Sequence, residues 1–319
     1  MVITWGLENA SHNPKTITTL GSYDGVHVGH QQILARLHER KKELHLDRSL
    51  LLTFHPHPQE VLQFPLLRGE GRVSGPIELL TTIDERLELL EKEGLDEVVV
   101  IKFTKEFSQT SYIDFFRDTL VEALGTRAMV VGFNHAFGKN REGDTEHLKK
   151  LAPEMGISIE EVEPVYRDGI SISSSKIRLA LKAGDTANAN AWLGRPYLIE
   201  GRVVHGDSVG KTLGFPTANL EIDPVKLIPA DGVYAARAMV REKAYKAALS
   251  IGSKPTTRQD GERTVEALLL DFDGDLYGDA LRVECLRYLR PQEAFASLDE
   301  LKHAIARDVS VIREIEHHP

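Results

Sequence analysis

The sequence predicts two domains of different class: an α/β domain with a parallel sheet, followed by an antiparallel β-barrel with a terminal helix. Up to about residue 184, short apolar runs alternate with helical stretches, which is typical of βαβ units. After that point short strands are separated by Asp-Gly and Gly-Asp turns, which is typical of a barrel. The length of 319 residues is enough for two domains that each bury a core.

Composition and charge exclude several functional classes. The chain is 41% hydrophobic and 27% charged, as in globular proteins, and its formal net charge of −9 argues against a protein that coats nucleic acid. No apolar run approaches the roughly 18 residues of a membrane helix, and the first residues lack the pattern of a secretory signal. We therefore expect a cytoplasmic protein without nucleic-acid or membrane partners. The single cysteine, Cys285, lies in an alternating stretch that predicts a buried structural thiol.

The first domain is expected to place its polar residues along one edge of a parallel sheet. Ligands bind such sheets beyond the carboxyl ends of the strands, and polar loops follow several of the apolar runs here. We therefore expect these loops to converge. Helices are expected at residues 83–95 and 111–124, where apolar residues recur at near-helical spacing. The predicted strands are residues 17–20, 49–54, 97–103, 128–132 and 157–162.

Residues 16–34 form the stretch around which the chain is organised: an apolar strand, a turn and the start of a helix. The N–H groups and dipole of a helix N-terminus attract phosphate, and imidazoles can donate hydrogen bonds to it. The pattern therefore indicates a nucleotide phosphate site. A plain strand–turn–helix with surface histidines explains an isolated HxGH equally well. The polar and glycine positions are Gly21, Asp24, Gly25, His27, Gly29 and His30.

Two later loops of this domain have the character of pocket walls. Pro56, His57 and Pro58 form a stiff segment after the second strand. It suits the wall of a ligand pocket better than a zinc site, because no second group of ligands accompanies it. Asn134 and Phe137 follow the fourth strand, where an aromatic ring either packs internally or stacks on a flat ligand.

The last polar cluster of the domain lies at the start of a helix. A serine at this position is an ordinary N-cap, and that explains one of Ser174 and Ser175. The basic residues Lys176 and Arg178 oppose the helix dipole, so their presence indicates a bound anion.

The second domain begins with a glycine-rich segment. Glycines at this spacing let backbone N–H groups approach phosphate, although the segment does not match the GxxxxGK[ST] pattern of a P-loop. The positions concerned are Gly206, Gly210, Lys211 and Gly214.

Three oxygen-bearing side chains of the second domain are candidates for chemistry. Thr217 and Asn219 lie on the same side of an extended segment and offer hard ligands for magnesium, although a simple turn explains these residues alone. Glu266 shares a predicted strand face with Leu268 and Leu270. A carboxylate on an apolar face is unfavourable unless it has a polar partner or takes part in catalysis. The alternative interpretation is that Glu266 lies at the end of the barrel and is exposed to solvent.

Together these segments resemble a known family. GSYDGVHVGHQQIL, TFHPHP, LLTT, VGFNHAFGKNREGD and SISSSKIR, in this order, resemble the Rossmann-like nucleotidyltransferase domain of prokaryotic bifunctional riboflavin kinase/FMN adenylyltransferases, or FAD synthetases. GFPTAN and the segments after it resemble the riboflavin kinase domain of the same family. The resemblance covers nearly the whole chain. It implies an FMN adenylyltransferase domain at residues 1–184 and a riboflavin kinase domain at residues 185–319.

The resemblance implies two ATP-dependent reactions. In the second domain riboflavin would be phosphorylated to FMN, with Glu266 as the base and with Thr217 and Asn219 holding Mg²⁺. In the first domain FMN would be adenylylated to FAD with release of pyrophosphate, while His27 and His30 stabilise charge on the phosphates.

The resemblance also assigns supporting roles. Ser174, Ser175 and Arg178 would hold the ATP phosphates, and Asn134 would help to position the reacting groups. The flavin pocket would be lined by Pro56, His57, Pro58 and Phe137. Further nucleotide contacts are expected at Gly21, Asp24, Gly29, Gly206, Gly210, Lys211 and Gly214. The chain departs from the commonest family residues at Tyr23, His55, Ser175 and Lys211, where Phe, an acid, Thr and Arg are usual.

Two other functions fit parts of the pattern. The HxGH half alone also fits a cytidylyl- or adenylyltransferase for a sugar, pantetheine or nicotinate nucleotide, whereas the attached GFPTAN domain does not. A flavin-binding regulator without catalysis would keep the fold, but the complete set of polar residues argues against it. The sequence predicts no oligomeric state.

Overall fold

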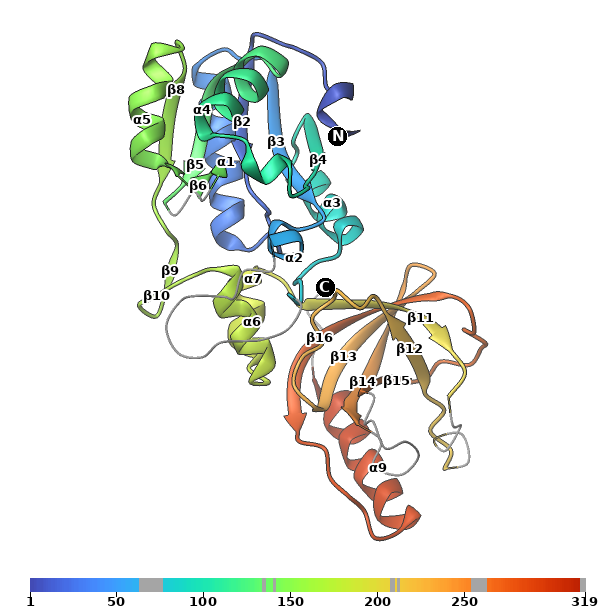
Figure 1. Cartoon of the computed structure of the whole chain (residues 1–319). Coiled ribbons are helices and arrows are strands. Elements are labelled where there is room, and N and C mark those ends of the chain that lie inside the picture. Colours follow the sequence, from blue (N-terminus) through green and yellow to red (C-terminus); the bar gives the residue numbers. More distant parts are fainter. Residues whose placement is uncertain are drawn as a thin grey trace. The chain divides into compact units, whose positions relative to one another are not determined.

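In the computed structural model the chain forms two compact units, Met1–Ser174 and Ser175–Pro319 (Figure 1). The fold class predicted for each half is confirmed: a parallel sheet in the first unit and a closed antiparallel barrel in the second. The structure describes residues 1–62, 77–133, 136–139, 142–206, 210, 213–253 and 263–315.

The first unit is built on a six-stranded parallel sheet with the order β1-β4-β3-β2-β5-β8. Strand β1 was not expected from the sequence, and it adds an edge strand beside β4. The strands are β1 (Val2–Trp5), β2 (Thr16–Leu20), β3 (Arg48–His55), β4 (Glu97–Lys102), β5 (Thr126–Gly132) and β8 (Ser158–Val162). Two short hairpins pair β6 (Ala136–Phe137) with β7 (Gly143–Asp144) and β9 (Tyr166–Arg167) with β10 (Ile170–Ser171).

Helices cover both faces of this sheet. Successive residues of a strand point to opposite faces, so Leu50 and Leu51 of β3 belong to different apolar clusters. Leu50 packs in the cluster that contains Phe116 of η3, and Leu51 in the cluster that contains Leu34 of α1 and Leu87 of α3. The helices are η1 (Leu7–Asn9), α1 (Val28–Glu43), α2 (Pro58–Leu62), α3 (Ile83–Lys92), η2 (Phe107–Gln109), α4 (Tyr112–Asp114), η3 (Phe115–Ala123) and α5 (Thr145–Glu154).

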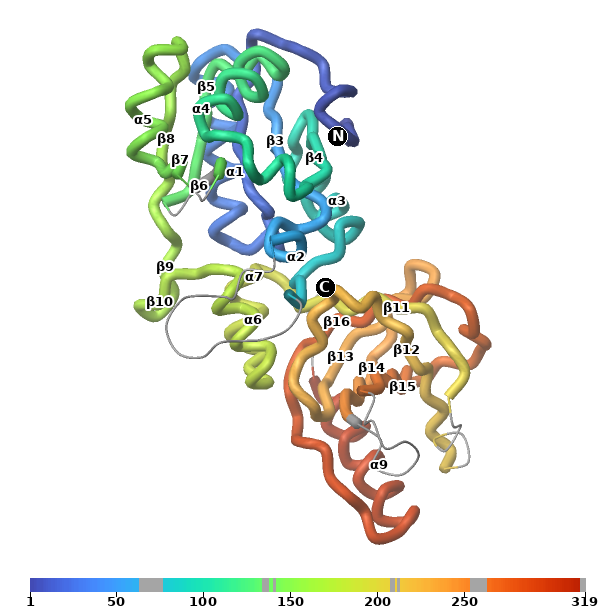
Figure 2. Tube along the Cα trace, viewed as in Figure 1, coloured from blue at the N-terminus to red at the C-terminus, as the bar shows by residue number. Residues whose placement is uncertain are grey.

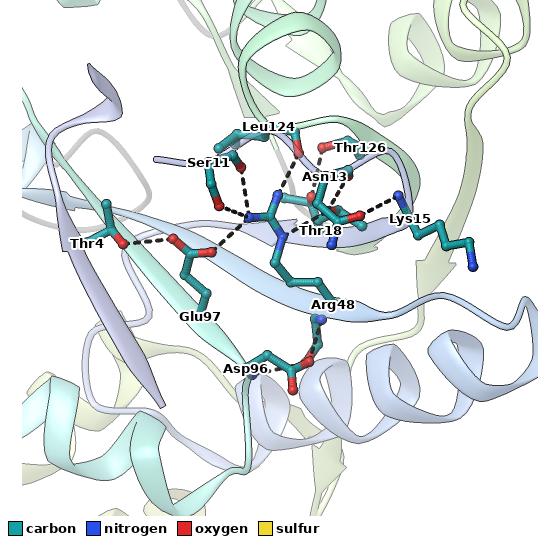
Figure 3. Close-up of polar contacts among 12 residues, drawn as sticks. Thr4, Ser11, Asn13, Lys15, Thr18, Arg48, Asp96, Glu97, Leu124 and Thr126 are labelled. Carbon is teal, nitrogen blue, oxygen red and sulfur yellow. Dashed lines mark hydrogen bonds and ion pairs between the residues drawn. The ribbon is translucent and has the colours of Figure 1, made fainter. Parts of the chain in front are cut away.

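A buried arginine joins the amino-terminal ends of the strands (Figure 3). The Arg48 guanidinium donates to Glu97 Oε2 at 2.9 Å, to Thr16 Oγ1 at 2.9 Å and to the Leu124 carbonyl at 2.6 Å. Thr4 Oγ1 donates to the other Glu97 oxygen at 2.7 Å. Arg48 and Glu97 are 7% and 6% exposed, so the pair is shielded from water. It fixes four strands at the edge opposite the one where ligands are expected.

The second unit is a closed barrel with the order β11-β12-β15-β14-β13-β16. Its terminal helix α9 lies beside the barrel strands (Figure 2). Ile305, Val309 and Ile312 of this helix pack in one cluster with Leu268 and Leu270. Cys285 is fully buried, as predicted, and burial raises its pKa to about 12. The elements are β11 (Tyr197–Val204), β12 (Ala218–Ile222), β13 (Gly232–Val240), β14 (Lys243–Ser253), β15 (Arg263–Leu269), β16 (Ala280–Arg290) and α9 (Leu298–Glu314).

Two helices follow the sheet unit along the chain and precede the first strand of the barrel: α6 (Ser174–Lys182) and α7 (Thr186–Leu193). All of their residues except Ser174 belong to the second unit. Asn190 of α7 donates to the Cys285 carbonyl at 2.9 Å and accepts from the Tyr197 amide at 2.8 Å. Helix α7 is therefore part of the barrel unit. The division into functional domains at residues 184 and 185 stays a prediction.

Replacement of Glu97 by alanine is expected to destabilise the sheet unit by about 3 kcal/mol, because the buried Arg48 charge loses its counter-ion. The free energy of unfolding can be measured from hydrogen exchange of peptides that contain β2 and β3. Asp47→Ala is the matched control: this exposed acid pairs with Lys15 at 3.5 Å, and its loss is expected to change stability by less than about 1 kcal/mol. Equal effects of the two substitutions would contradict the role given to the buried pair.

Candidate active sites

The first candidate site is the turn between β2 and α1, at the carboxyl edge of the sheet. The backbone takes positive φ values at Tyr23 (49°), Gly25 (86°) and Val26 (37°). Such values are unfavourable for a bulky or β-branched residue, so contacts from elsewhere must hold this turn. The turn ends at His27, the N-cap of α1.

Asp24 supplies many of the contacts that hold the turn. It is 2% exposed, and its carboxylate accepts hydrogen bonds from the Leu80 amide at 3.0 Å and the Thr81 amide at 2.9 Å. Its backbone carbonyl accepts from Ser174 Oγ at 2.8 Å. The nearest Arg86 nitrogen lies 3.9 Å from the carboxylate. Asp24 therefore connects the turn to the segment before α3 and to the first residue of α6.

The two histidines form one stacked column with a tyrosine. The His27 and His30 ring centroids are 3.7 Å apart with planes at 14°, and Tyr23 stacks on His30 at 4.5 Å. The Tyr23 hydroxyl and Thr19 Oγ1 share a hydrogen bond of 2.8 Å, and burial raises the pKa of this tyrosine. The column fixes the position of both imidazoles relative to the helix start. The hydroxyl of Tyr23 thus has a buried partner where the family usually has Phe.

Helix capping determines the tautomer of His27. Its Nδ1 accepts from the His30 amide at 3.3 Å, so the proton of the neutral ring is on Nε2, which acts as a donor. Gly29 is what permits this arrangement, since a Cβ there would lie 3.1 Å from His27 Cε1. A side chain at position 29 would therefore push the His27 ring away from its capping position.

The proline–histidine loop places His57 as a second capping histidine. Its Nδ1 accepts from the Gln59 amide at 3.2 Å, and its own amide donates to Glu60 Oε1 at 2.8 Å. The side chain is 6% exposed, and Pro56 and Pro58 beside it are half-buried.

A nearby aromatic pair was not predicted from the sequence. Trp5 at the end of β1 is 48% exposed and lies edge-on to His55, with ring centroids 6.0 Å apart. Because β1 itself was not expected, no sequence signal placed Trp5 near this loop.

The structure thus gathers Gly21, Asp24, His27, Gly29, His30 and Ser174 around one turn. Ser175 and Arg178 follow Ser174 in α6 and belong to the second unit, where Arg178 is 9% exposed. Asn134 and Lys211 lie outside the described residues, as does the side chain of Phe137.

The second candidate site lies in the barrel, where β12 meets β15. Asn219 and Glu266 are directly paired across these strands, and Thr217 Oγ1 donates to Glu266 Oε2 at 3.1 Å. A Cβ on Gly206 would overlap the Asn219 side chain, and one on Gly210 would lie 3.4 Å from Thr217 Oγ1. Gly206 therefore lies against the Asn219 side chain, and Gly210 lies close to Thr217. Gly214, in the same segment, is exposed with φ 83°.

Comparison with known proteins identifies the family to which the chain belongs. Residues 9–176 match the FAD synthetase family, and residues 193–316 match the riboflavin kinase family. The chain belongs to the bifunctional riboflavin kinase/FMN adenylyltransferases. The β2–α1 turn lies within the part that matches FAD synthetase, and the site between β12 and β15 lies within the part that matches riboflavin kinase. The resemblance inferred from the motifs is confirmed.

Relatives cover almost the full length of the chain. The bifunctional riboflavin kinase/FMN adenylyltransferase of Escherichia coli (strain K12) is 36% identical over 317 residues, covering 98% of this chain and 97% of that protein. The Bacillus subtilis (strain 168) enzyme of the same name is 34% identical over 297 residues, covering 92% and 90%. A solved structure from Streptococcus pneumoniae, described as a macrolide-efflux protein, is 28% identical with a TM-score of 0.86 and covers 99% and 100%. Within the described ranges of the present chain, no helix combines the length and apolar character needed to cross a bilayer.

Replacement of Gly29 by alanine is expected to lower the rate of FMN adenylylation roughly tenfold or more, because the new Cβ displaces the His27 ring. Helical stability is expected to stay the same or rise, since alanine has the higher helix propensity. Initial rates of FAD formation and the melting temperature measure the two effects. Ala35→Gly, on an exposed position of the same helix, is the control and is expected to lower stability with the rate unchanged. A fall in both rate and stability for Gly29→Ala would contradict the packing argument.

Proposed function

We propose that this chain makes FAD from riboflavin in two steps, one at each candidate site. In the barrel, the 5′-hydroxyl of riboflavin attacks the γ-phosphate of ATP and gives FMN and ADP. In the sheet unit, the FMN phosphate attacks the α-phosphate of a second ATP and gives FAD and pyrophosphate. The observation that carries this proposal is the pairing of two independent polar sites, Asn219–Glu266 and His27–His30, each within the matching family region.

In the kinase step Glu266 accepts the proton of the attacking hydroxyl. The Thr217 hydroxyl donates a hydrogen bond to Glu266 Oε2 and so orients the Glu266 carboxylate. Oε2 accepts this bond through one of its lone pairs. Phosphoryl transfer depends mainly on positioning and charge neutralisation, and this site offers a carboxylate held by a hydrogen bond from Thr217. Backbone N–H groups at Gly206, Gly210 and Gly214, with the Lys211 side chain, would contact the ATP phosphates.

Thr217 and Asn219 are the residues that would hold Mg²⁺, which neutralises phosphate charge when bound. Their hydroxyl and amide oxygens are the hard ligands that magnesium prefers. In the described part of the chain no group of three His, Cys, Asp or Glu side chains forms a metal cluster. Substrate phosphates and water are oxygen ligands that would share the coordination of the ion with these two side chains.

In the adenylyl step the protein supplies charge stabilisation and no nucleophile, because the FMN phosphate is the nucleophile. His27 and His30 would donate hydrogen bonds to the phosphates as negative charge builds up. Two imidazolium rings 3.7 Å apart repel each other, so the column favours at most one positive charge. The hydroxyl proton of Ser174 is given to the Asp24 carbonyl, so its phosphate contact would come from its backbone N–H.

The remaining residues complete the adenylyltransferase site. Ser175 and Arg178 would hold the ATP phosphates together with Ser174, and Asn134 would align the reacting groups. Gly21 and Gly29 would let the nucleotide approach the backbone, while Asp24 acts through the hydrogen bonds that it accepts. The flavin pocket would be lined by Pro56, His57, Pro58 and Phe137. We propose that the enzyme works in the cytoplasm on these small molecules and needs neither nucleic acid nor a membrane.

Substitutions at the two sites are expected to separate the two steps. Glu266→Ala should lower FMN formation by about 10²- to 10⁴-fold and leave adenylylation of added FMN unchanged, because it removes the base of one site only. His30→Ala should do the reverse, so that FMN accumulates. Chromatography of flavins after incubation with riboflavin, ATP and Mg²⁺ distinguishes the products.

Wild-type protein is the reference in the same assay and is expected to give both FMN and FAD. Full kinase turnover by Glu266→Ala would overturn the base assignment, and full FAD formation by His30→Ala would make the histidine column structural. A wild-type protein that binds flavins without converting them would support the non-catalytic alternative.

A further inference from the structure

The LLTT segment, Leu79–Thr82, has no role in either reaction described above, yet it lies against the His27 turn. Leu79, Leu80 and Thr81 are 4%, 1% and 3% exposed, so the segment is buried just before α3. Amides of Leu80 and Thr81 donate to Asp24, which brings the segment to the base of the turn.

We propose that Thr81 is a positioning residue for adenylyl transfer: its hydroxyl joins Asp24 to Gly25 and thereby fixes the turn that presents His27 and His30. The proposal rests on the adenylyltransferase function assigned above to these histidines. It gives a chemical role to a residue that touches neither substrate.

The hydroxyl of Thr81 has a defined direction. The Gly25 amide donates to Thr81 Oγ1 at 3.0 Å, and Arg86 Nε donates to the same oxygen at 3.5 Å. The hydroxyl donates its own proton to Asp24 Oδ1 at 3.1 Å. Its proton and two lone pairs are thus all used inside the protein, where water has little access. Valine has the same shape but can make none of these bonds, whereas serine can make them all.

The residue that Thr81 binds, Gly25, lies only two positions before His27 in the chain. Gly25 and Val26, both at positive φ, directly precede His27. The His30 amide donates to His27 Nδ1 at 3.3 Å, so a rotation of the turn that ends at His27 would alter this capping bond. Loss of the cap would free the His27 ring from its stack on His30. The geometry therefore makes the histidine column depend on the Thr81 hydroxyl.

The neighbouring threonine provides a matched control. Thr82 Oγ1 accepts from the Glu85 amide at 3.3 Å, and the Thr82 amide donates to Glu85 Oε2 at 3.0 Å, which caps α3. These bonds stabilise the same segment but do not reach the turn. Thr82→Ala therefore tests general loosening of the segment, and Thr81→Val tests the link to the turn.

The experiment compares full-length wild type, Thr81→Val, Thr81→Ser and Thr82→Ala. For each protein, kcat and KM of FMN adenylylation and the rate of riboflavin phosphorylation are measured. NMR of ¹³C-labelled histidine rings, assigned with His27→Gln and His30→Gln, reports on the stacked column.

Thr81→Val is expected to lower kcat of adenylylation by about 10- to 100-fold, with KM for FMN changed by less than about threefold, as for a misplaced catalytic group. Its riboflavin phosphorylation should be unchanged, and the ring signals of His27 and His30 should shift. Thr81→Ser should restore both kcat and the ring signals. Thr82→Ala should resemble wild type in both. If Thr81→Val does not fold, Thr81→Cys takes its place with the same expectations, because a thiol forms only weak hydrogen bonds.

A wild-type kcat in Thr81→Val, or a lower kcat with unshifted histidine signals, would overturn the positioning role. So would an equal effect of Thr82→Ala. If wild-type protein forms no FAD, the proposed function fails instead. The ring signals then still decide whether Thr81 controls the histidine column.

Discussion

The first site depends on one buried carboxylate. Asp24 accepts hydrogen bonds from Leu80 and Thr81 through its side chain and from Ser174 through its carbonyl. A buried carboxylate is tolerated only when its oxygens are satisfied, and here three donors and the buried Arg86 guanidinium at 3.9 Å meet that requirement. The consequence is electrostatic as well as structural, because Arg86 offsets an anion that would otherwise repel a polyphosphate from the helix N-terminus above it.

The two sites are positioned by different physical means. In the sheet unit the candidate side chains lie on a turn with unfavourable backbone angles, which long-range hydrogen bonds such as that from Gly25 to Thr81 help to hold. In the barrel the register of β12 against β15 alone places Asn219 opposite Glu266. A slip of one residue would send these side chains to the opposite face of the barrel wall. The first candidate site is therefore expected to be sensitive to the packing around its turn, and the second candidate site to strand pairing.

Local signals in the sequence predicted what depends on local physics. Apolar runs placed β2 to β5, near-helical spacing of apolar residues placed α3, and strand alternation predicted a buried Cys285. Local sequence signals could not predict long-range contacts. The hydrogen bond from Gly25 to Thr81 spans 56 residues, and the one from Thr217 to Glu266 spans 49. The motifs identified these residues as a set, but not which of them bond to each other. Strand β1 was missed because VITW, although mostly apolar, is only four residues long and does not alternate between apolar and polar residues.

The burial of Cys285 has a practical consequence for labelling chemistry. It is the one cysteine in 319 residues, and burial raises the pKa of its thiol well above the usual range, so the thiolate is scarce at neutral pH. The thiolate is the species that reacts with maleimides, iodoacetamides and disulfides. A single cysteine introduced on the surface would therefore be modified selectively without removal of the native thiol. Fluorophores or spin labels can thus be attached beside either active site of the unaltered fold.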